Sequence, residues 1–145
     1  MIRIWFNHWF STAYSIIQLI KKDESDFQII GSNEREQAVY KKVCDEWHIE
    51  PVLKDEEYVS YCLDFCEKNR IDIFAPRRKL VAISRHKDQF ERIGVKVLVD
   101  DYEAVNMLNR KDLAYKFFKE NGIGIVPEYC SVTTADEFLH AYESL

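Results

Sequence analysis

Glycine and proline are scarce in this sequence of 145 residues, which holds four of the first and three of the second. No low-complexity tract occurs either, and this composition excludes a collagen-like or intrinsically disordered chain. Basic residues are outnumbered, because 20 Lys and Arg face 25 Asp and Glu, and the formal charge is −5. A chain with this charge lacks the positive field that attracts a phosphate backbone, so we expect no nucleic acid among its partners.

Paired cysteines and long apolar runs are also missing. Four cysteines occur, with no Cys-x-x-Cys pair among them: Cys44, Cys62, Cys66 and Cys130. In a chain long enough to bury its own core, this pattern favours reduced thiols over a disulfide framework. Asn7 interrupts the first apolar run and Gln18 interrupts the next, so no stretch of about 18 apolar residues exists. We therefore expect a cytoplasmic protein without a membrane partner.

Short apolar segments alternate with segments of helical periodicity over the first hundred residues. Strands are predicted over 2–6, 27–30, 47–51, 71–75 and 95–99, with the second ending at Gly31 and a turn at Gly94 before the last. Between them, apolar stripes predict helices over 13–20, 59–66 and 79–92, the first capped by Ser11 or Thr12, and a polar helix is predicted over 36–42. Residues 80–83 alone are also compatible with a strand. This alternation predicts an α/β fold with a doubly wound parallel sheet, Rossmann-like, covered on both faces.

Ligands of such sheets bind beyond the carboxyl ends of the strands, where this chain carries polar residues. The loop after the first strand has no glycine, whereas a dinucleotide site needs glycines there to let the backbone approach the pyrophosphate. An NAD or FAD site is therefore not expected. Asn7, Ser11 and Asn33 are instead candidate contacts for a small substrate, since they follow or end predicted strands.

The stretch from Arg77 to Arg92 is locally basic, with two acids, Asp88 and Glu91, in a negative chain. One interpretation is an exposed basic helix. The other is a site for a phosphate or carboxylate, formed by Arg77 and Arg78 where that helix begins.

The cysteines and histidines of the sequence do not predict a metal site or a catalytic site. Cys62 and Cys66 share a helical stripe with Val59 and Leu63, so we expect core thiols rather than zinc ligands. The four histidines lie far apart in the sequence and define neither a catalytic triad nor a metal site.

The alternation of strands and helices ends after Asp101, where one predicted helix follows another without a strand between them. A short helix is predicted over 102–108, and a second passes through Leu113 and stops at Gly122. Thr134 stands three residues before Glu137, which predicts a capping box and a further helix.

This last segment resembles the entrance to the ATP-grasp fold. Lys111 corresponds to the family's lysine at the start of a helix, Gly122-Ile123 with Pro127 to the turn that ends it, and Thr134 with Glu137 to the next helix. Arg110 stands where the family usually has Asp. The preceding sheet is similar to the family's pre-ATP-grasp domain, as in the large subunit of carbamoyl-phosphate synthase.

The resemblance implies an N-terminal fragment of an ATP-grasp ligase, with a pre-ATP-grasp domain over 1–108 and a truncated start of the ATP-grasp subdomain over 109–145. Such ligases use ATP and Mg²⁺ to activate a carboxylate substrate as an acyl phosphate and join it to an amine. Lys111 is the implied nucleotide contact. No catalytic residue or metal ligand of the family can be matched, so we expect no cofactor in this fragment and no activity from it alone. A homodimer is left open.

Two other hypotheses belong to different classes. A non-catalytic flavodoxin-like domain that binds a small anion or a protein needs only the parallel sheet and the basic segment after Pro76. Half of a Rossmann oxidoreductase is the other, and the glycine-free first loop argues against it.

Overall fold

The computed structural model describes residues 1–7, 11–23 and 26–144. The chain divides into two compact units, Met1–Val105 and Asn106–Leu145. The expected domains, 1–108 and 109–145, stay a prediction. Within the described ranges, no helix is long and apolar enough to cross a membrane.

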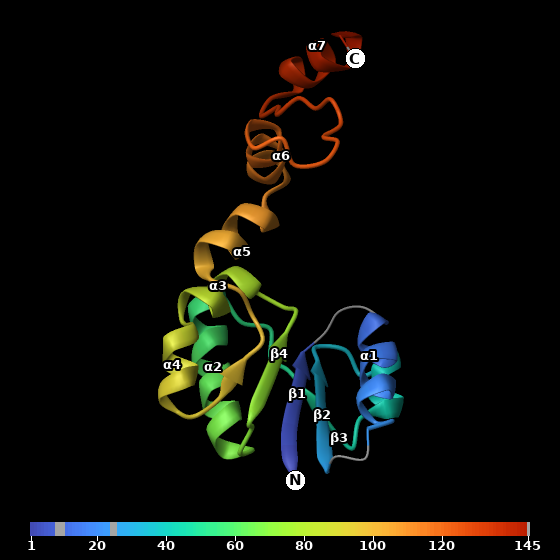
Figure 1. Ribbon diagram of the computed structural model, residues 1–145, viewed down its shortest axis with the longest axis vertical. Helices are drawn as coiled ribbons and strands as arrows, with labels where there is room; N and C mark the ends of the chain where they lie inside the picture. Colours follow the sequence, from blue (N-terminus) through green and yellow to red (C-terminus); the bar gives the residue numbers. More distant parts are fainter. Residues whose placement is uncertain (8–10, 24–25, 145) are drawn as a thin grey trace. The chain divides into compact units, whose positions relative to one another are not determined.

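A five-stranded sheet forms the centre of the first unit (Figure 1). Its strands are β1 (Ile2–Asn7), β2 (Phe27–Asn33), β3 (Glu46–Ile49), β4 (Ile73–Pro76) and β5 (Lys96–Val97). They lie in the order β3-β2-β1-β4-β5, and every neighbouring pair is parallel. The chain thus winds outward from β1 in one direction and from β4 in the other, which confirms the predicted doubly wound, Rossmann-like α/β fold.

Helices cover both faces of this sheet (Figure 1). One face carries α1 (Thr12–Ile20) and the 3₁₀ helix η1 (Val39–Val43), and the other carries α2 (Asp55–Lys68), α3 (Leu80–Arg85) and α4 (Lys87–Arg92). Alternation along β1 supplies both cores, since successive side chains of a strand point to opposite faces. Ile4 and Phe6 pack in the core under α1. Trp5 packs in the core under α2, with its ring centroid 4.1 Å from that of Phe74.

Gly31 does not end β2, contrary to the prediction, because the strand continues to Asn33. A Cβ at Gly31 would lie 2.4 Å from the Cys44 Sγ and 2.9 Å from the Trp47 ring. Glycine is therefore needed for close packing inside the strand rather than for a turn. Gly94, with a φ of 81°, does form the expected turn before β5.

Other local predictions also need correction. The helix expected over 36–42 is the short η1, in which buried Tyr40 donates its hydroxyl hydrogen to the Ser32 carbonyl. The helix expected over 79–92 is broken into α3 and α4, because His86 leaves helical geometry at a φ of −111° and a ψ of 18°. The last strand pairs only over β5, and Leu98 beyond it is 52% exposed. Ser11 precedes α1 but makes no side-chain capping hydrogen bond.

The helices after Asp101 begin and end close to where the sequence places them. They are α5 (Tyr102–Asn109), α6 (Lys111–Glu120) and α7 (Ala135–Ser144). The end of α6 is a Schellman motif, in which the Ile123 N–H donates to the Phe118 carbonyl at 2.9 Å and Gly122 has a φ of 63°.

The predicted capping box of α7 is confirmed. The Glu137 N–H donates to Thr134 Oγ1 and the Thr134 N–H donates to Glu137 Oε2, both at 3.2 Å.

Candidate functional site

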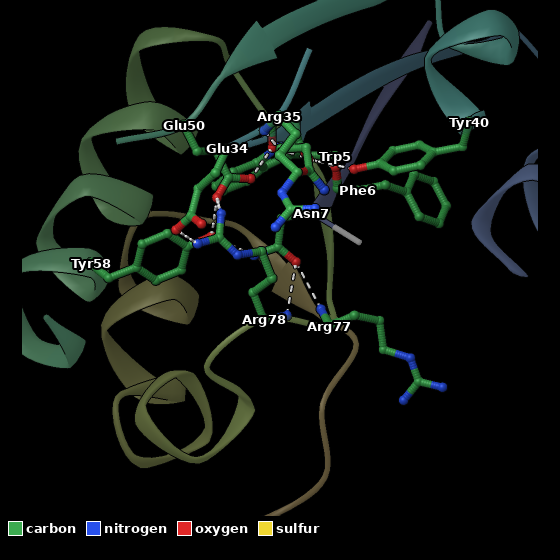
Figure 2. Close-up of polar contacts among 12 residues, drawn as sticks. Trp5, Phe6, Asn7, Glu34, Arg35, Tyr40, Glu50, Tyr58, Arg77 and Arg78 are labelled. Carbon is green, nitrogen blue, oxygen red and sulfur yellow. Dashed lines mark hydrogen bonds and ion pairs between the residues drawn. The ribbon is translucent and has the colours of Figure 1, made fainter. Parts of the chain in front are cut away.

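Polar residues gather at the carboxyl ends of four strands, on the edge of the sheet where the strand order reverses between β1 and β4. Asn7 ends β1, Asn33 ends β2, Glu50 follows β3, and Arg77 and Arg78 follow β4. This is the edge at which open α/β sheets bind ligands. Figure 2 shows that several of these side chains face one another.

Asn7 ties the end of β1 to the loop after β4. Its Oδ1 accepts the backbone N–H of Arg77 at 2.7 Å and that of Arg78 at 3.5 Å, and its Nδ2 donates to the Tyr58 hydroxyl at 2.8 Å. The side chain is fully buried. These bonds make Asn7 a positioning residue for the β4 loop, and its direct contact with a substrate stays a prediction.

Glu50 lies at the centre of a buried polar cluster. Its Oε1 accepts the Ser32 hydroxyl at 2.5 Å, and its Oε2 accepts the Tyr58 hydroxyl at 2.6 Å and the guanidinium of Arg78. The Trp5 indole N–H donates to Ser32 Oγ at 2.6 Å. Desolvation by burial, with the nearby Cys62 and Glu50, raises the pKa of Tyr58, so its hydroxyl keeps the proton that it donates. We call this group the Glu50 cluster: Trp5, Asn7, Ser32, Glu50, Tyr58 and Arg78.

Arg78 is an internal ion-pair partner, which corrects its placement on an exposed basic helix. Its side chain is 2% exposed and pairs with both Glu34 and Glu50. The guanidinium carbon also lies 5.1 Å from the centre of the Tyr58 ring (Figure 2). Arg77 differs, because it is exposed and its side chain extends away from the Glu50 cluster. An anion site formed by the two arginines stays a prediction.

Ser11 and Asn33 meet at a cavity of about 200 Å³ beside the end of β2, which we call the β2 hollow. The described residues that line it are Ser11, Asn33, Arg35, Gln37, Ala38, Val39 and Tyr40. Asn33 is buried, and its Oδ1 accepts the backbone N–H of Arg35 at 2.9 Å. The structure thus brings two of the predicted substrate-side residues to one cavity, while Asn7, Arg77 and Arg78 are not among the residues lining it.

Lys111 is exposed at the first position of α6. Arg110 before it binds the Asp112 carboxylate through Nη2 at 2.6 Å, and this hydrogen bond lowers the pKa of Asp112. The second unit has a cavity of about 690 Å³, lined in part by Gly122 and Pro127 of the predicted turn but not by Lys111. The contact of Lys111 with a nucleotide stays a prediction.

The described residues offer no metal centre, because no group of three or more His, Cys, Asp or Glu among them could hold an ion. The described residues therefore do not form a magnesium site. Cys62 and Cys66 are buried core thiols, as predicted, and desolvation by burial raises the pKa of both.

Several members of the site escaped sequence reasoning, above all Glu50 and Tyr58. Glu50 carried a usable signal, because it is a charged residue close to the end of the strand predicted over 47–51. Tyr58 and Trp5 carried none, since Trp5 lies within an apolar strand segment and Tyr58 next to an apolar helical stripe, and both look like ordinary core residues.

Comparison with known proteins gives one family. The family described as PylC-like, N-terminal domain, matches residues 11–98. No curated protein matches the sequence.

Solved structures share the fold. N5-carboxyaminoimidazole synthetase from Staphylococcus aureus, complexed with ADP, is similar with a TM-score of 0.70 at 14% identity, over 99% of this chain and 35% of that chain. N5-carboxyaminoimidazole ribonucleotide synthetase from Thermotoga maritima gives 0.65 at 16% identity, over 98% and 36%. The biotin carboxylase domain of 2-oxoglutarate carboxylase from Hydrogenobacter thermophilus gives 0.64 at 16% identity, over 98% and 32%. The chain thus spans about a third of the length of these structures.

Proposed function

Because the chain belongs to the PylC-like N-terminal domain family, we propose that it is the substrate-side part of an ATP-grasp ligase. The resemblance to a pre-ATP-grasp domain is confirmed by the family match and by the shared fold. We propose further that the parent protein, in the cytoplasm, activates a carboxylate as an acyl phosphate and joins it to an amine. The family match over residues 11–98 carries this proposal.

The sheet edge supplies two kinds of residue for this task. Ser11 and Asn33 reach the β2 hollow and are the proposed substrate contacts. The Glu50 cluster holds the loops in place, since Asn7 fixes the backbone after β4 and Glu50 anchors Arg78. Such a rigid platform favours the reaction by orienting the substrate before the chemistry begins.

The nucleotide side of the proposal rests on Lys111. A carboxylate is a poor acyl donor, and ATP with Mg²⁺ would supply the phosphoryl group that activates it. A lysine ammonium can hold the phosphates and offset developing charge, which is most of what phosphoryl transfer asks of a protein. With this one candidate lysine and no metal cluster among the residues described, we expect the 145-residue chain alone to show no ATP turnover.

The test is Lys111→Ala in the complete product of the gene. We expect the ATP concentration needed for half-maximal ADP formation to rise, because a phosphate contact is lost. Lys116→Ala is the matched control, since Lys116 is also exposed on α6. An ATP dependence that stays the same in Lys111→Ala would remove this lysine from the site, and ATP turnover by the 145-residue chain would disprove its expected inactivity.

A non-catalytic domain that binds a small anion is the second candidate. The observation that favours it is the β2 hollow, which carries a cation and lies within the first unit. Anion binding by a complete gene product that forms no ADP with any carboxylate would select this candidate over the ligase.

A further inference from the structure

The β2 hollow contains a cation that neither the predicted site nor the Glu50 cluster uses. Arg35 lines the hollow, and its guanidinium makes no hydrogen bond or ion pair with the rest of the described chain. Only its backbone is engaged, by the buried Asn33. Arg35 is thus held at the cavity by its main chain while its charge is available.

The acids next to Arg35 in the sequence are already paired with other cations. Glu34 pairs with the buried Arg78, and Glu36 pairs with Lys41. None of the described residues that line the hollow is acidic. In a chain with a net charge of −5, a cavity whose described lining residues include one cation and no acid is electrostatically distinct, and it favours an anion.

A second donor lies in the same cavity. Ser11 lines the hollow and occupies the N-cap position of α1, yet its side chain makes no capping bond. Its hydroxyl hydrogen can therefore point to a ligand. The nine-residue α1 begins here, and the positive end of its dipole adds to the same field.

We propose that the β2 hollow binds the anionic group of a small ligand, a carboxylate or a phosphate, with Arg35 as its cation and Ser11 as a hydrogen-bond donor. The volume of about 200 Å³ limits the occupant to the charged end of the ligand rather than a whole nucleotide. The assignment of this ligand as the parent's substrate rests on the proposed ligase function, whereas the anion site itself does not.

The experiment is a titration of the 145-residue chain with inorganic phosphate and, in a separate series, with acetate. Both titrations are monitored by ¹H–¹⁵N NMR at constant ionic strength. We expect saturable shifts at Ser11–Ala13 and Asn33–Tyr40. Saturation by phosphate alone identifies a phosphate ester as the ligand class, saturation by acetate alone a carboxylate, and saturation by both the shared anionic group. No saturable shift with either anion would overturn the proposal.

Two variants test whether Arg35 is the cation that binds the anion. Arg35→Gln should weaken binding about tenfold or more, since a charge-assisted hydrogen bond is lost. Arg92→Gln removes an equal charge from an exposed side chain of α4, on the opposite face of the sheet, and should leave the affinity unchanged. If Arg35→Gln and the unsubstituted chain bind the anion with equal affinity, Arg35 is not part of the site.

ADP formation by the complete gene product separates the two proposals. If anion binding fails but carboxylate-dependent ADP formation is found, the β2 hollow is not the substrate site and the ligase proposal stands. If the anion binds at Arg35 but no carboxylate supports ADP formation, the anion site stands and the ligase proposal fails.

Discussion

Replacing Arg78 by Met should destabilise the first unit strongly. The side chain is 2% exposed and pairs with two carboxylates, of which Glu50 is completely buried and Glu34 is 18% exposed. Methionine keeps most of the apolar stem but leaves the Glu50 charge without its cation. Removing one partner of a buried ion pair typically costs about 3–5 kcal/mol, and a lost cation–π contact with Tyr58 places the expected value toward the upper end.

The assay is urea denaturation followed by tryptophan fluorescence, because Trp5 donates a hydrogen bond within the Glu50 cluster and reports on this unit. Adding Glu50→Gln to Arg78→Met removes the orphaned charge while retaining one amide oxygen that can accept the hydroxyl of Ser32 or of Tyr58. The double variant should therefore recover roughly 1 kcal/mol or more, as expected of residues in direct contact.

Arg92→Met is the control, since an exposed pair contributes about 0–1 kcal/mol. A loss in Arg78→Met no greater than that of the control would refute the assignment of a buried ion pair. Strictly additive effects of Arg78→Met and Glu50→Gln would refute it as well.

Three further predictions concern other parts of the chain. With a chromogenic disulfide reagent, the exposed Cys130 should react quickly and the other thiols slowly, because they are shielded and burial raises the pKa of Cys44 to about 12; several fast thiols would contradict the packing. Gly31→Ala should lower the free energy of unfolding by about 1–3 kcal/mol in urea denaturation, because its Cβ would lie 2.4 Å from Cys44 Sγ, and Cys44→Ala should restore part of it. A neutral result for Gly31→Ala would exclude the close contact. The pKa of Glu137 is lowered, mainly by the Thr133 N–H, so its contribution to α7 is complete above the usual value of 4.5 and is lost as the pH falls through the lowered one. Helical NMR shifts in α7 should therefore diminish in acid, and Glu137→Gln should remove that dependence; identical acid titrations of the two proteins would count against the capping box.

The fold was predictable because its signals are local. Ile2–Phe6 and Phe27–Ile30 are rich in β-branched and aromatic residues, and the stripe on α2 repeats with helical spacing. The capping box at Thr134 and the turn at Gly122 are likewise set by residues a few positions apart. Such patterns determine an element before any tertiary contact forms.

Gly31 shows where this reasoning fails. A glycine after four strand residues is typical of a turn, yet its role depends on Cys44 and Trp47, which approach it only after the chain has folded. The same holds for His86, whose break between α3 and α4 has no proline or glycine to announce it.

The candidate site was predictable in its place but not in its bonding. The sequence placed Asn7, Asn33 and Arg78 at or after the carboxyl ends of strands, and they lie there in the structure. That these ends meet a ligand stays a prediction. The partners of Glu50 come from three separate segments, and only the order β3-β2-β1-β4 brings them together. Whether a polar side chain holds a loop or faces a ligand depends on such contacts.

The most direct measurement is ADP formation from ATP and Mg²⁺ by the complete product of the gene, with a panel of carboxylates and amines. We predict ADP release that requires a carboxylate and that demands more ATP after Lys111→Ala. No ADP release with any carboxylate, or release at the same rate without one, would contradict the proposal that this chain is part of an ATP-dependent carboxylate ligase.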